Sequence, residues 1–194
     1  MRDAGIGRLL VASLHQGIAD RLPDRLEFYE NWLNPRGLRD GTIGLAPLHA
    51  VLSFLRTEGP SYAEVTTAAG DYAGAWAMSE LPAMKRWSLS SLPGPISRRV
   101  ALGIARDAIA SAYTGSRIKV KARQRTGTFD IRGSIFCGVR EPVAQPLCQF
   151  YAAAVVRVLA EAGIPATSEI TSCQATGGHG CVVKVDMTQA LETA

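Results

Sequence analysis

The sequence predicts an α+β fold in which a helical layer packs on a small antiparallel sheet. The first observation behind this prediction is helical periodicity through most of residues 1–113, with apolar side chains three and four positions apart. The second is a change at Ser116, after which apolar and charged residues alternate with the period of a half-buried strand. From the last of these helices onward, the predicted order of elements is α-β-β-α-β-β. With 194 residues, 47% of them apolar, the chain can form a folded core.

The first 60 residues are predicted to form a helical segment of their own. Apolar residues recur at helical spacing over 9–18, 26–33 and about 47–56, and prolines and glycines separate the three runs. The remaining region, 61–190, is assigned to a ligand-binding domain.

Two more helices are expected before the sheet. An alanine-rich helix covers 62–78, and another covers about 97–113. Residues 81–98 lie between them and contain three prolines and four serines, which predicts a loop that serves as a lid or a connector.

A hairpin, a helix and a second pair of strands complete the predicted fold. Thr126-Gly127 is expected to form the hairpin turn, and the return strand is expected to include Ile135. A helix of about 16 residues should begin near Pro146. Two strands, about 167–173 and 181–185, then flank a glycine-rich loop.

The first strand of the hairpin carries five cations in alternation: Arg117, Lys119, Lys121, Arg123 and Arg125. Such a row suits docking to an acidic protein, acidic lipid headgroups or nucleic acid. The absence of interleaved aromatic residues argues against single-stranded nucleic acid, because bases would have nothing to stack on. The alternative is a solvated strand whose charges prevent edge pairing.

The cysteines predict a metal site in the second half of the chain. Cys173 and Cys181 bracket the glycine-rich loop, so their thiols should lie near each other, and Cys148 lies at a helix start, where the helix dipole favours thiolate. Three soft ligands of this kind suit tetrahedral zinc. Glu169, Cys137 and His179 are candidates for the fourth ligand. The alternative is that the cysteines are small buried side chains that fill space.

Three segments together resemble a known domain: the hairpin running into Arg132–Ile135, the helix opening Pro146–Tyr151, and the ending Glu169–Cys181. They are similar to the 4-vinyl reductase domain, which belongs to a superfamily with haem–nitric-oxide-binding domains and TRAPP vesicle-tethering subunits. The helical segment Ala69–Gly74 fits the same family more loosely, and residues 1–60 are outside the resemblance.

The resemblance implies both a ligand and a metal. Family members include sensors of phenol-like molecules, proteins suggested to bind hydrocarbons, and a protein linked to bacteriochlorophyll vinyl reduction, so a small apolar or aromatic ligand is expected. In the sensors a structural zinc is held by three cysteines, which carry over onto Cys148, Cys173 and Cys181, and by a glutamate. Ile170 stands at the position of that glutamate, one residue from Glu169. Cys137 as a fourth thiolate would instead make an all-cysteine site, compatible with zinc or with an iron–sulfur centre.

These observations favour a non-enzymatic binding domain. The sequence contains no phosphate-loop, dinucleotide-binding or nucleophile-elbow motif. The expected ligand pocket lies between the helices and the sheet and is lined by Trp76, Trp87, Phe129, Phe150 and Tyr151. Two alternatives stay open: an enzyme or accessory factor of tetrapyrrole metabolism, and a TRAPP-like scaffold. A homodimer or a complex with a partner protein is expected.

The chain is also expected to be cytoplasmic. No secretory signal is recognisable, and no apolar run approaches the roughly 20 residues that cross a bilayer. In the cytoplasm the four cysteines are expected as thiols or metal ligands rather than as disulfides.

Overall fold

The computed structural model describes residues 5–33, 44–84, 89 and 92–187. Within these ranges the chain forms six α-helices and one four-stranded antiparallel sheet, which confirms the predicted α+β fold. The elements in chain order are α1 (Arg8–Arg21), η1 (Pro23–Arg25), α2 (Leu26–Glu30), α4 (Leu45–Thr57), α5 (Ser61–Ser79), α7 (Gly94–Ala112), β1 (Arg117–Arg123), β2 (Thr126–Arg132), η2 (Ile135–Cys137), α8 (Gln149–Glu161), β3 (Ala166–Ser172), η3 (Gln174–Thr176) and β4 (Cys181–Met187). Among the described residues, no helix is both long and apolar enough to span a bilayer.

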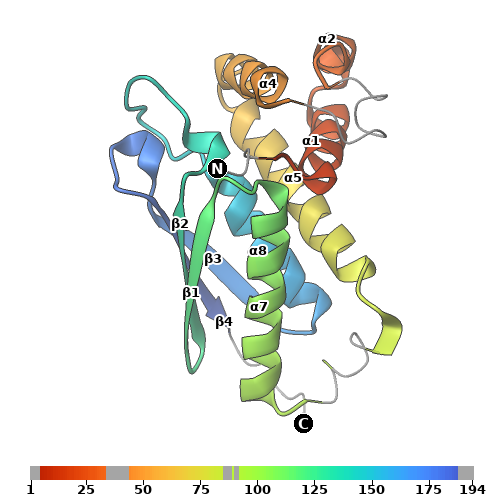
Figure 1. The fold of residues 1–194 in the computed structure, drawn as a ribbon, viewed down its shortest axis with the longest axis vertical. Coiled ribbons are helices and arrows are strands. Elements are labelled where there is room, and N and C mark those ends of the chain that lie inside the picture. The colour runs from red at the N-terminus through yellow and green to blue at the C-terminus, as the bar shows by residue number, and fades with distance from the viewer. Residues whose placement is uncertain (1–4, 34–43, 85–88, 90–91, 188–194) are drawn as a thin grey trace.

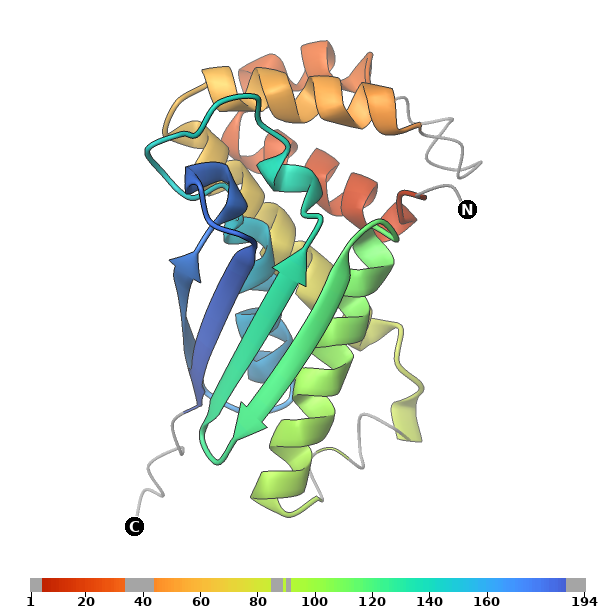
Figure 2. The same cartoon turned by 60° about the vertical axis from the view of Figure 1, so that its left-hand side comes forward.

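The helices form layers on one face of the sheet. The strand order is β1-β2-β4-β3, and α7 and α8 pack directly on the strands. Figure 1 shows α5 and α1 beyond α8, and Figure 2 shows the strands in front with the helices behind them. The predicted order α-β-β-α-β-β therefore corresponds to α7-β1-β2-α8-β3-β4.

The core lies between the sheet and this helical layer. Phe129 on β2 and Val183 on β4 are adjacent in register and fully buried, and they alternate with residues on the open face. Leu10 and Leu14 of α1 are also fully buried and belong to the same hydrophobic core. The N-terminal helices thus share a core with the sheet, and the division of the chain at residue 60 stays a prediction.

The β1–β2 hairpin turns two residues earlier than the sequence suggested. Arg123 pairs with Thr126, so the turn consists of Gln124 and Arg125 and not of Thr126-Gly127. Gln124 adopts a positive φ of 34°. Gly127 instead lies on β2 beneath Leu102 of α7, where an added Cβ would come within 2.8 Å of the leucine side chain. Because Gly127 has no side chain, α7 can pack closely on β2 at this position.

The return strand also ends earlier than expected. β2 ends at Arg132, and Ile135 lies in the short helix η2. Gly133 turns the chain with a φ of 70°, a conformation that favours glycine. From the sequence, Cys137 was expected near the end of the return strand. Because of this turn it lies at the end of η2 instead.

β3 contains a β-bulge just before Cys173. Ile170 pairs with Val183 whereas Ser172 pairs with Val182, so Thr171 is the additional residue. Because successive side chains of a strand point to opposite faces, the additional residue reverses the facing of those that follow it. Ile170 and Cys173 therefore both face the helical layer, although they are three positions apart.

α5 and α8 approach each other closely at two glycines of α5. A Cβ at Gly70 would collide with the carbonyl oxygen of Phe150, and a Cβ at Gly74 would come within 2.7 Å of the carbonyl oxygen of Ala154. The backbones of the two helices meet at these positions, and this contact holds α8 against the rest of the helical layer.

Gly70→Ala tests this contact. We expect the substitution to lower the free energy of unfolding by about 1–3 kcal/mol, because overpacking at the helix crossing outweighs a gain of about 1 kcal/mol in helix propensity. Gly103→Ala on α7 is the matched control, since nothing lies within 4 Å of the added Cβ there, and it should stabilise the protein. Denaturant unfolding at constant m-value measures both. Equal effects at the two positions would contradict the close approach of α5 and α8.

Candidate metal centre

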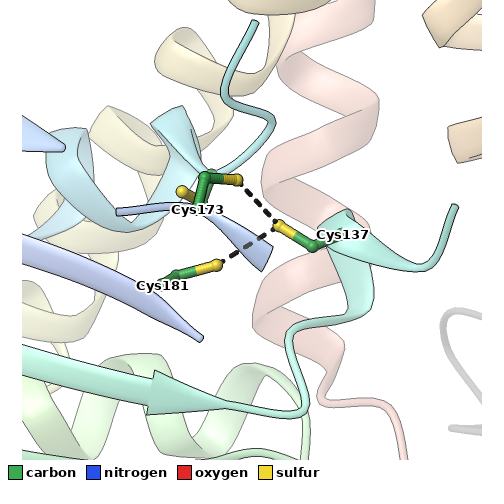
Figure 3. Close-up of side chains that lie close together, drawn as sticks. Cys137, Cys173 and Cys181 are labelled. Carbon is green, nitrogen blue, oxygen red and sulfur yellow. Dashed lines mark hydrogen bonds between the residues drawn. The ribbon is translucent and has the colours of Figure 1, made fainter. Parts of the chain in front are cut away.

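Four cysteines from four separate segments meet at one end of the sheet. Cys137 ends η2, Cys148 is the N-cap residue of α8, Cys173 follows the bulge of β3, and Cys181 begins β4. Their sulfur atoms all lie within 4.8 Å of one another, and no residue of the four is more than 3% exposed. Figure 3 shows the side chains of Cys137, Cys173 and Cys181 pointing toward one another from these elements.

The sulfur positions fit a tetrahedral metal site. The Sγ of Cys137 lies 3.4 Å from that of Cys173 and 3.3 Å from that of Cys181. All four cysteines are free thiols. A tetrahedral zinc with Zn–S bonds of about 2.3 Å separates its sulfurs by about 3.8 Å, so small side-chain adjustments suffice to place an ion between them. Four thiols at these separations could therefore hold a metal ion in a closed site with four thiolate ligands.

The hydrogen bonds among the thiols lower the pKa values of two cysteines and raise those of the other two. A hydrogen bond from Cys148 is the largest cause that lowers the pKa of Cys137, and one from Cys137 is the largest that lowers the pKa of Cys173. The pKa values of Cys148 and Cys181 are raised, chiefly by their hydrogen bonds with Cys137. Without a cation, four thiolates cannot lie together in a buried space, so some of the thiols keep their protons. A divalent ion can replace those protons.

Backbone contacts around the cluster hold its loops in place. The amide of Leu147 donates to the Sγ of Cys173 over 3.4 Å, and the amide of Val143 donates to the carbonyl of Ala175 over 2.8 Å. The loop before α8 is thus attached to the η3 turn, and it positions Cys148 beside Cys173. An N–H donor to sulfur also stabilises thiolate.

Arg56 of α4 fixes the turn that carries Cys137, a role that no pattern in the sequence indicated. Its guanidinium donates to the carbonyl of Phe136 over 3.0 Å and to that of Gly138 over 3.3 Å, on either side of Cys137. In the sequence Arg56 is only a basic residue in the last turn of a helix. Phe136 in turn stacks on Phe150 at 4.8 Å, which surrounds the sulfurs with apolar side chains.

The other candidate ligands lie outside the cluster. Glu169 is exposed on the open face of the sheet, opposite Lys184, because it precedes the bulge that turns Cys173 inward. His179 is exposed in the loop between η3 and β4, where its carbonyl accepts a hydrogen bond from Arg132. Of the fourth ligands considered, the structure brings only Cys137 to the other three cysteines.

The row of cations lies mostly on the open face of the edge strand β1. Arg117, Lys119, Lys121 and Arg123 are exposed there. Arg125, expected on the same strand, lies in the hairpin turn, because the turn comes earlier than predicted. The neighbouring strand supplies Asp130 opposite Lys119. The role of this row in docking stays a prediction.

The aromatic residues expected to line a pocket mostly fill the core. Phe129, Phe150 and Tyr151 are each at most 1% exposed, and Trp76 is half-buried against Tyr72 on α5. Trp87 lies outside the described residues. Cavities occur elsewhere, among them one of about 670 Å³ between α1, α5 and α7, and one of about 560 Å³ beside the cysteine cluster.

Comparison with known proteins identifies the fold and no family. No protein-family model matches the sequence, and no curated protein matches it significantly. Among solved structures, an Fe(II) unliganded H-NOX protein mutant from K. algicida is similar at 9% identity and a TM-score of 0.61, covering 97% of this chain and 100% of that one. The phenol-responsive sensory domain of the transcription activator PoxR, solved with phenol, is similar at 13% identity and a TM-score of 0.54, covering 74% of each chain. A trafficking protein particle complex subunit 3 from Naegleria fowleri, covalently bound to palmitic acid, is similar at 15% identity and a TM-score of 0.50, covering 75% of this chain and 95% of that one.

These likenesses agree with the superfamily that the sequence resemblance indicated. Sensor, H-NOX and trafficking-complex structures all share the fold of this chain. At such low identity the likeness concerns the fold alone. The 4-vinyl reductase assignment itself stays a prediction.

Cys137→Ser and Glu169→Gln decide between two of the three candidate fourth ligands. Cys137→Ser removes one thiolate and should weaken zinc binding by at least about tenfold, since losing even a group that orients a ligand has an effect of this size. Glu169→Gln should leave the zinc affinity unchanged. Competition against a chromophoric chelator measures both constants. The reverse ranking would assign the fourth position to Glu169.

Proposed function

We propose that this chain is a non-enzymatic domain that binds a small apolar molecule and that a cysteine-ligated zinc ion stabilises. The observation that supports the proposal is the meeting of four buried thiols from four segments of the chain. Cysteines that only fill space in the core would have no reason to bring their sulfur atoms together. Four sulfur ligands bind zinc in preference to harder metal ions such as magnesium or calcium.

The geometry supports a structural role for the ion. All four coordination positions would be taken by Cys137, Cys148, Cys173 and Cys181, which leaves none for a water or substrate. The ion would join η2, the start of α8 and the facing ends of β3 and β4. It would therefore fix the loops at this end of the sheet.

The fold and its cavities support the ligand-binding part of the proposal. Two of the similar structures carry a small apolar or aromatic molecule, phenol in one and palmitic acid in the other. Cavities of about 560 and 670 Å³ lie within the usual size of small-molecule sites. A homodimer or a complex with another protein belongs to the same proposal, because a binding domain acts through the molecules that it contacts.

An iron–sulfur centre is the second candidate for the cluster. Four thiolates also hold iron centres, and the burial of the site would suit either metal. The visible spectrum separates the two, since a zinc site is colourless. A tetrapyrrole role and a TRAPP-like scaffold stay alternatives that the thiol cluster does not favour.

Zinc removal should destabilise the protein. With free zinc at a thousandfold excess over its dissociation constant, binding contributes about 4 kcal/mol, which corresponds to about 8–16 °C in Tm for a chain of this size. Elemental analysis should find one zinc per chain, and thermal unfolding before and after chelation should show this fall, with recovery on adding zinc but not magnesium. A metal-free protein of unchanged Tm would refute the proposal.

Zinc binding should also release protons. The raised pKa values of Cys148 and Cys181 mean that both thiols stay protonated near pH 7 in the metal-free protein, so zinc should displace the protons of at least these two thiols. Protons compete with the metal, and zinc affinity should therefore rise as the pH is raised. Calorimetric titration in buffers of different ionisation enthalpy measures the number released, and a value near zero would contradict these protonation states.

A further inference from the structure

A smaller cavity, of about 370 Å³, lies between the start of α7 and the β1–β2 hairpin. Figure 2 shows the hairpin turn and the start of α7 together at the lower end of the molecule. Cys181 begins β4, whereas Met187, which lines this cavity, ends the same seven-residue strand, about 20 Å away. The cavity is therefore at the other end of the sheet from the cysteines, and its chemistry is independent of the proposed function.

Arginines line this cavity from both of its sides. Pro95, Arg98, Arg99 and Leu102 follow one another at helical spacing and share one face of α7, and Arg125 lines the opposite side from the hairpin turn. No carboxylate lines the cavity within the described part of the chain. Three cations around one small cavity repel one another, and an anion placed among them removes that cost.

Two of these arginines have no counter-charge within the described ranges. Arg98 and Arg99 make no ion pair and no side-chain hydrogen bond with any described residue. Arg99 is exposed, whereas Arg98 is half-buried and its Nε is covered without a partner. A cation that is partly removed from water is costly unless it is paired, so the position of Arg98 favours a bound anion.

The start of α7 adds to the positive potential of the cavity. Pro95 is the second residue of this 19-residue helix, so the positive end of the helix dipole lies at the cavity wall. The first turn contains no acidic residue, and no side chain caps it. Helix starts and arginines both favour phosphate groups.

Packing holds the two sides of the cavity together. Leu102 of α7 lies over Gly127 of β2, where an added Cβ would come within 2.8 Å of the leucine side chain. The amide of Met187 donates to the carbonyl of Arg125 over 2.7 Å, which attaches the hairpin turn to the end of β4. Since the backbone on both sides is already held in place, little of it has to be ordered when a ligand binds.

We propose that this cavity binds a small, soluble phosphate monoester. Its phosphoryl group lies among Arg98, Arg99 and Arg125 beside the start of α7, and its organic part contacts Leu102 and Met187. A phosphate monoester carries nearly two negative charges near pH 7 and three oxygens that guanidinium groups can bind in pairs. A carboxylate offers one charge and two oxygens to the same three cations. A cavity of this volume is of the size of a small-molecule site, which favours an organic phosphate over a single ion.

Three probes test the proposal on the purified full chain by calorimetry: phenyl phosphate, benzoate and inorganic phosphate. Phenyl phosphate should bind at least about tenfold more tightly than benzoate, because it makes more hydrogen bonds between charged groups. It should also bind more tightly than inorganic phosphate, because its ring is removed from water. Equal affinity for phenyl phosphate and benzoate would overturn the recognition of a phosphoryl group. Equal affinity for phenyl phosphate and inorganic phosphate would overturn the contact with an organic part.

Substitutions of single arginines assign the binding to this cavity. Arg98→Gln should weaken phenyl phosphate binding by at least about tenfold, the effect of losing one hydrogen bond between charged groups. Arg99→Gln, at an exposed position that leaves the core intact, should weaken it in the same direction. Arg117→Gln is the matched control, since Arg117 lies at the far end of β1, about 20 Å from Arg123 and beyond the reach of screened charge. Equal losses for Arg98→Gln and Arg117→Gln would reduce the binding to a general attraction of anions and overturn the site.

Vesicles that contain phosphatidic acid distinguish a soluble ligand from a lipid headgroup of the same chemistry. We expect these vesicles not to compete with phenyl phosphate, and competition would assign the phosphoryl site to a membrane lipid and overturn the soluble ligand. A chain that binds zinc but none of the probes would keep the proposed function and lose this inference. A chain that binds phenyl phosphate but no zinc would keep this inference and lose the proposed function.

Discussion

The structure depends on the crowding of four sulfur atoms in a buried space. Thiols from η2, α8, β3 and β4 lie within 4.8 Å of one another, and no more than 3% of any of these residues is exposed. Such a cluster is not stable as four thiolates, because their charges repel and water is excluded. Either protons or a divalent cation must balance the charge, and in the proposed function it is the cation that joins the four segments. The arrangement of loops at this end of the sheet follows from that requirement.

Three features of the fold bring the sulfurs to one point. The left-handed turn at Gly133 ends β2 and carries the chain into η2. The bulge at Thr171 turns Cys173 to the inner face of the sheet, beside Cys181. The close contact of α5 with α8 at Gly70 sets the position of the helix start that holds Cys148. Each feature serves ordinary packing, and together they build a site whose ligands are far apart in the sequence.

The fold by itself leaves the function open. Similar structures include one solved with phenol, one bound to palmitic acid and one with Fe(II), so the same architecture accommodates different molecules. Function in such a fold is decided by local chemistry, here the donor set of the cluster and the residues that line the adjoining cavity. Arg56 connects the two, because it lines the cavity and also holds the turn that carries Cys137.

Periodicity and composition determined much of this protein from the sequence alone. The helices, the four strands and their order follow from apolar spacing, which is a local property, and Cys148, Cys173 and Cys181 stand out by residue type and position. The tertiary structure alone decided which residue joins them. Glu169 was a candidate by distance along the chain, yet a one-residue bulge, which no local pattern reveals, places it on the opposite face from Cys173. Cys137 joins the cluster instead, because a glycine turn and Arg56 of a distant helix position it there. Contacts of this kind depend on how segments remote in sequence pack, and the sequence pattern does not carry that information.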